Sequence, residues 1–176
     1  MSEIDYEAIS DAEERERQFL DREAGNAEDA AAKAKVIARS WERLRDEVGP
    51  VAGPRQNINV EASVRDFRSR ANAARARADT LHALARKSPG VFAARVVASI
   101  RAEAQGQEAE HIEWRLRADN PEAFIDSVEH LRNLDPSDQA DSFRWEEASR
   151  RHMVLAQREV IDEYEALAEP DAPSEP

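Results

Sequence analysis

The chain has 176 residues, no cysteine and a formal net charge of -12, and only 6% of its residues are aromatic. The absence of cysteine excludes disulfide bonds, thiolate metal sites and a cysteine nucleophile. Much of the 41% hydrophobic content is alanine, so the composition favours thin helix-on-helix packing over a thick globular core. We therefore predict an all-α, elongated helical bundle.

For residues 1–48 the sequence pattern predicts an amino-terminal helical arm made of two helices. The first reaches about Glu23, and its sparse apolar positions mean that it needs a partner surface from this chain or another. Gly25 followed by Asn26 is expected to end it, giving either a tight hairpin or one bent rod. The second helix carries an unbroken heptad seam: Ala27, Ala30, Ala34, Ile37, Trp41, Leu44 and Val48.

A hinge is predicted at residues 49–56, where two prolines and two glycines within six residues exclude a continuing helix. The domain beyond it, residues 57–168, is expected to hold a helical hairpin followed by two carboxy-terminal helices. The last stretch, residues 169–176, is acidic and rich in proline, which is typical of a disordered tail.

For residues 60–118 the sequence pattern predicts the central element of the bundle, an antiparallel, coiled-coil-like helical hairpin. Heptad spacing holds on both sides of Pro89, and a reversal there would place Phe67 opposite His111. The flanking charges fit the same alignment as three pairs: Arg68 with Glu108, Arg70 with Glu110, and Arg77 with Glu103.

The charge is distributed unevenly along the chain. Residues 60–101 carry nine basic and three acidic side chains, whereas the rest of the chain is acidic. We expect acidic helices of this chain or of another copy to neutralise this basic island, because the rest of the molecule repels free nucleic acid. The island comprises Arg68, Arg70, Arg75, Arg77, Arg86 and Lys87.

Glu108 and His111 form an E-x-x-H pair, the spacing that ferritin-like di-iron helical bundles use to place a carboxylate and an imidazole on one helix face. The predicted hairpin keeps His111 far from His82, so a metal site would need a second subunit. The favoured interpretation is that His111 stacks on Phe67 within the seam, with no metal and no other cofactor.

Arg77 and His82 match the spacing R-x-x-x-x-H, and in this respect the helix is similar to nucleases of the HEPN type. That resemblance implies RNA cleavage by two copies that bring two such pairs together. Ala78 stands where the family usually has a polar residue, and the predicted seam buries it.

The function predicted from these patterns is non-enzymatic. Heptad seams on several helices favour a structural, assembly or adaptor protein that binds other protein chains, including copies of itself, as in a phage particle or another large complex. No apolar run is long enough for a membrane span, and the acidic start is unlike a signal peptide, so we expect a cytoplasmic protein or one inside a viral particle. The alternatives are a metalloprotein and an RNA-binding or RNA-cleaving module. Candidate interface residues are Ile37, Trp41, Leu44, Val48, Trp145 and Leu155.

Overall fold

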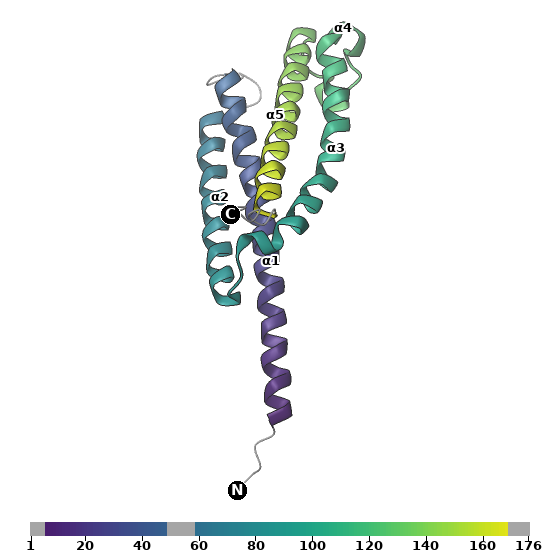
Figure 1. The fold of residues 1–176 in the computed structure, drawn as a ribbon. Coiled ribbons are helices and arrows are strands. Elements are labelled where there is room, and N and C mark those ends of the chain that lie inside the picture. The colour runs from purple at the N-terminus through teal and green to yellow at the C-terminus, as the bar shows by residue number, and fades with distance from the viewer. Residues whose placement is uncertain (1–5, 49–58, 169–176) are drawn as a thin grey trace, which may run out of the picture.

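The computed structural model describes residues 6–48 and 59–168, and all the regular structure in these ranges is helical (Figure 1). This confirms the predicted all-α helical bundle. None of the described helices has both the length and the apolar character that crossing a membrane requires. The helices are α1 (Tyr6–Val48), α2 (Val60–Ala85), η1 (Pro89–Phe92), α3 (Ala93–Asp119), α4 (Pro121–Phe124), η2 (Glu129–Leu131) and α5 (Pro136–Ala168).

The bundle consists of two helix pairs joined through α1. Helix α1 packs on α2, α3 packs on α5, and α1 also packs on α5, so that α1 lies between α2 and α5 (Figure 1). The amino-terminal part of α1 extends beyond the end of the bundle.

Small residues hold α1 and α2 close together. Ala27 and Ala31 of α1 form a buried cluster with Ala78 of α2, and side chains of this size allow two helix backbones to approach closely. Toward the other end of the pair, Trp41 stacks on Phe67 with ring centroids 5.7 Å apart. The pair therefore has an alanine-lined end and an aromatic end.

The main core lies where α3, α5 and α1 meet. Phe143 of α5 is completely buried against Trp114 of α3, with ring centroids 6.2 Å apart. The largest buried cluster draws on all three helices and comprises Ala32, Val36, Ala93, Val96, Val97, Ile100, Ala156, Val160, Ile161 and Tyr164.

The predicted hairpin of residues 60–118 is wrong, because α2 and α3 take different partners. Phe67 stacks on Trp41, and His111 lies 3.1 Å from Glu147 of α5. The chain leaves α2 through Arg86 in a left-handed conformation (φ 54°), and η1 then directs α3 onto α5. The predicted Arg–Glu pairs are replaced by Arg68–Glu42, Glu108–Arg158, Arg70–Asp66, Glu110–Arg150 and Glu103–Lys33.

The predicted break at Gly25 is also absent, since α1 runs as one helix through this position. A Cβ atom added at Gly25 would lie 2.9 Å from Arg95 Nη1 and 3.1 Å from Phe92 Cδ1. Glycine therefore allows η1 to approach α1, and the cost of one glycine within a helix is only about 1 kcal/mol. The predicted hinge at 49–56 and tail at 169–176 lie outside the described residues.

Candidate protein-interaction surface

Where its side chains are described, the part of α1 that extends beyond the bundle is largely exposed to solvent. Every residue from Asp11 to Phe19 is exposed, and Leu20 is only partly buried. We call Asp11–Leu20 the projecting segment (Figure 1). Its side chains make polar contacts only within the segment: Arg15 with the Asp11 carbonyl, Gln18 with Glu14, and Arg17 with Glu14.

Burial begins abruptly after this segment. Ala24 of α1 is completely buried, and we call Ala24–Leu44 the packed segment. At the junction, Lys87 beyond the end of α2 pairs with Asp21 at 3.5 Å, while Phe92 of η1 lies against Gly25. The ends of two other elements thus surround α1 where the projecting segment leaves the bundle.

A buried charged cluster anchors α1 one turn further on. The Glu28 carboxylate is fully buried; its Oε1 accepts hydrogen bonds from Arg75 Nη1 at 2.7 Å and from the Tyr164 hydroxyl. His82 Nε2 lies 3.2 Å from Glu28 Oε2, at ion-pair distance but without hydrogen-bond geometry. The His82 ring stacks on Phe92, so the cluster links α1, α2, η1 and α5. A buried carboxylate needs such partners because burial of an unpaired charge is very costly.

The environment of Glu28 shifts the pKa values of its partners. Burial and the hydrogen bond to Glu28 both raise the pKa of Tyr164, so its hydroxyl remains a donor. Burial alone would lower the pKa of Arg75, but its hydrogen bonds to Glu28 and Asp79 outweigh this effect and raise it. The arginine and tyrosine therefore hold their protons at neutral pH.

A groove lined mainly by alanine lies between α1 and α2, beside this junction. Its volume is about 470 Å³, and we call it the alanine groove. Arg77 at its edge has no ion-pair partner among the described residues. The lining residues are Glu23, Asn26, Ala27, Ala30, Ala73, Ala74 and Arg77.

Exposed apolar side chains gather around the same junction. Phe19 is 52% exposed, and exposed Leu84 lies one turn before Lys87, which pairs with Asp21. Val91 is exposed on η1, and exposed Leu167 is next to the site where η1 meets α5, since a Cβ at Gly90 would lie 2.7 Å from the Leu167 carbonyl oxygen. Two further exposed apolar side chains, Ile112 and Leu116, lie elsewhere, on α3. A group of exposed apolar side chains is typical of an interaction site.

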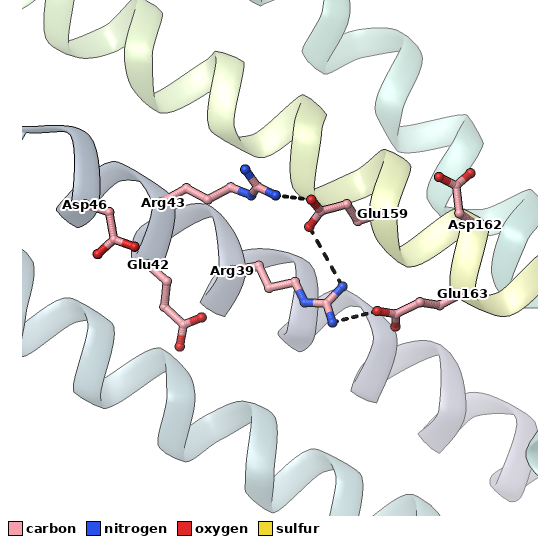
Figure 2. A pocket seen from close by; sticks show the side chains of 7 residues that line it. All are labelled: Arg39, Glu42, Arg43, Asp46, Glu159, Asp162 and Glu163. Atoms are coloured by element: carbon pink, nitrogen blue, oxygen red, sulfur yellow. Dashed lines mark hydrogen bonds and ion pairs between the residues drawn. The ribbon is translucent and has the colours of Figure 1, made fainter.

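A second, charged groove of about 680 Å³ separates α1 from α5 (Figure 2). Figure 2 shows Arg39 reaching Glu163 (2.6 Å) and Glu159 (4.0 Å), with Arg43 also binding Glu159. Burial raises the pKa of Glu163, but hydrogen bonds from Lys35 and Arg39 outweigh it and lower this pKa. These ion pairs fasten α1 to α5 and give the groove a structural role.

The sequence-predicted interface residues lie mostly inside the chain. Leu44 is only 2% exposed, and the ring of Trp41 stacks on Phe67. Ile37 lines a small groove between α1, α3 and α5, while Trp145 and Leu155 are partly buried on α5. The side chain of Val48 lies outside the description. Sequence analysis did not select Phe19, because the apolar residues of the first helix are sparse and show no heptad seam.

Four residues of the basic island form ion pairs within the chain. Arg68, Arg75 and Lys87 pair with acidic residues of α1, and Arg70 pairs within α2. Among the described residues, Arg77 and Arg86 have no ion-pair partner. The only unpaired charge of the island in the alanine groove is therefore Arg77.

The residues of the alternative sites are separated or engaged elsewhere. Glu108 pairs with Arg158 and His111 with Glu147. In the described ranges, no three His, Asp or Glu side chains are arranged to hold a metal ion. Arg77 faces the alanine groove, whereas His82 is buried against Glu28, so this R-x-x-x-x-H pair does not share one surface.

The fold and its surface define a helical bundle with a projecting helical segment. No protein-family model, curated protein or solved structure matches this chain.

Proposed function

We propose that this protein is a non-enzymatic structural or assembly component that associates with itself through the projecting segment. The observation that carries the proposal is the exposure of every residue from Asp11 to Phe19 on a helix whose continuation is buried. A phage particle or another large complex is a setting in which such a component would serve.

The energetics of the projecting segment support a partner. Asp11–Phe19 are all exposed, so this segment lacks the tertiary packing that supplies most helix stability in proteins. Surface pairs such as Glu14–Arg17 add only about 0.2–0.5 kcal/mol each. Phe19 is 52% exposed, so covering the rest of its side chain is worth about half of the roughly 1.5–3 kcal/mol that complete burial gives. A surface that covers Phe19 therefore supplies stabilisation that the described chain does not.

The distribution of charge supports a second copy as this partner. Residues 11–23 carry six acidic and three basic side chains, whereas residues 60–86 carry three acidic and six basic side chains. One chain thus offers surfaces of both signs, which favours association between copies and guides their orientation.

The test is the oligomeric state, measured by sedimentation equilibrium over a wide concentration series. We expect reversible association of the full chain and at least a roughly tenfold weaker association for Phe19→Glu, since the change puts a charge into a buried apolar contact. Hydrogen exchange of the projecting segment should slow as association rises.

Ile112→Glu is the matched control, because Ile112 is a similarly exposed apolar residue (61%) on α3, away from the projecting segment. Circular dichroism of both variants at low concentration checks that they fold. A chain that stays monomeric at every concentration, or equal weakening by both variants, would contradict the proposal.

A further inference from the structure

The exposed Phe19 side chain lies on the face of α1 that also lines the alanine groove. Ala12, Glu16, Phe19, Glu23 and Ala30 follow one another at spacings of three, four or seven residues, which aligns them along one side of α1. Of these, Glu23 and Ala30 line the groove, and Phe19 lies about one turn before it. The face therefore carries a large side chain and a hollow lined by small ones.

A surface that carries both a large side chain and a matching hollow can pair with a second copy of itself related by a two-fold axis. A two-fold axis makes each contact occur twice, so that residue i of one copy meets residue j of the other and the reverse. On α1 the axis must cross the helix between the ring and the hollow, near Glu23.

We propose, on the basis of the self-association suggested above, that two copies pair with antiparallel α1 helices and that Phe19 of each copy occupies the alanine groove of the other. The groove, of about 470 Å³, is large enough for the phenyl ring. Ala27, Ala30, Ala73 and Ala74 supply the small side chains of a hole for such a knob.

Charge complementarity identifies a second copy as the occupant. In the antiparallel alignment, Glu16 lies one turn from Phe19 and faces the groove edge where the other copy carries Arg77. Arg77 has no ion-pair partner among the described residues, and neither does Glu16. The two Glu23 carboxylates approach each other near the axis, so Glu23→Gln is expected to tighten the pair.

The chain has no cysteine, so disulfide cross-linking can test the alignment directly. We would mix the single variants Glu16→Cys and Ala73→Cys under mild oxidation. Disulfides need Cα atoms within about 7 Å, and we expect a covalent heterodimer from this mixture. Glu16→Cys alone should stay unlinked, because the two copies of residue 16 would lie roughly 20 Å apart at 1.5 Å per residue.

Ile112→Cys mixed with Ala73→Cys is the control and should remain unlinked. Efficient self-linking of Glu16→Cys would show that the projecting segments pair with each other, and would overturn the proposed alignment. A dimer seen in sedimentation without the 16–73 link would overturn groove docking while leaving self-association intact. A protein that remains monomeric at every concentration would contradict both groove docking and self-association.

A charge exchange gives a second, independent measurement. Glu16→Arg and Arg77→Glu should each weaken dimerisation up to about fivefold, in keeping with an exposed ion pair. The double variant should restore most of the loss. Equal and additive losses in the double variant would contradict the Glu16–Arg77 contact.

Discussion

The two segments of α1 differ in their surroundings although they belong to one continuous helix. The packed segment is lined by small side chains such as Ala27 and Ala31 and holds its one buried charge, Glu28, with partners from α2 and α5. The projecting segment is mostly charged, and its two large apolar residues are the exposed Phe19 and the partly buried Leu20. Both segments are helical, although only the packed segment is buried against other helices of the described chain.

The largest expected effect comes from removing the charge that anchors the packed segment. Glu28→Ala leaves the buried Tyr164 hydroxyl without an acceptor and leaves the partly exposed Arg75 with Asp79 as its remaining partner. An unsatisfied buried donor costs about 1–3 kcal/mol of unfolding free energy. Urea denaturation followed by circular dichroism, at concentrations below self-association, measures it.

Glu13→Ala on the projecting segment is the control for Glu28→Ala, and its effect should lie within about 0.5 kcal/mol. Similar losses of unfolding free energy in the two variants would show that Glu28 stabilises the fold no more than an exposed glutamate does. This result would contradict its anchoring role.

Acid should loosen the contact of the packed segment with α5. Burial acts to raise the pKa of Glu163, but Lys35 and Arg39 outweigh it and hold this pKa below its ordinary value of about 4.5, so the ionised form stabilises the folded state. This contribution is present above pH 4.5 and is lost as the pH falls through the lower, folded-state pKa. Glu163→Gln lacks it, so its stability should fall less steeply on acidification than that of the unaltered chain.

The measurement for Glu163 is the unfolding free energy as a function of pH from neutral to acid. Asp162→Asn is the matched control, since Asp162 lies in the same groove and has no ion-pair partner among the described residues (Figure 2). Equal slopes for Glu163→Gln and the unaltered chain would contradict the role given to these ion pairs.

The smallest effect distinguishes two helical glycines. A Cβ at Gly106 of α3 has no neighbour within 4 Å, so Gly106→Ala should stabilise the protein by about 0.4–1 kcal/mol. At Gly25, where the two segments of α1 meet, the same change brings a Cβ against Arg95 and Phe92 and should lose this gain. Thermal unfolding compares the two variants, and an equal gain at both positions would show that η1 is not tightly packed on α1.

The sequence was sufficient to predict the helical class, but not which helices pair. The heptad seam of residues 60–85 can face two other seams with similar spacing, one in α3 and one in α1. In the structure it faces α1, with Trp41 on Phe67 and Ala78 beside Ala27 and Ala31. Spacing fixes which face of a helix is buried and leaves the choice of partner open.

The buried charge and the projecting segment could not be obtained from periodicity. Glu28 is adjacent to the seam residue Ala27 and resembles a surface carboxylate until the α1–α2 alignment brings Arg75 and His82 to it. The first helix was predicted to need a partner surface, and whether this chain supplied it depended on the tertiary fold. Asp11–Phe19 are all exposed.

The pairing of neighbouring helices has a consequence for the order of folding. The pairs α1–α2 and α3–α5 each bring together segments closer in the chain than those of the α1–α5 contact, and closure of shorter loops is faster. Two helical hairpins can therefore form first and then dock. Trp41 lies in one hairpin, whereas Trp114 and Trp145 lie in the other, so intrinsic fluorescence provides a separate kinetic probe for each.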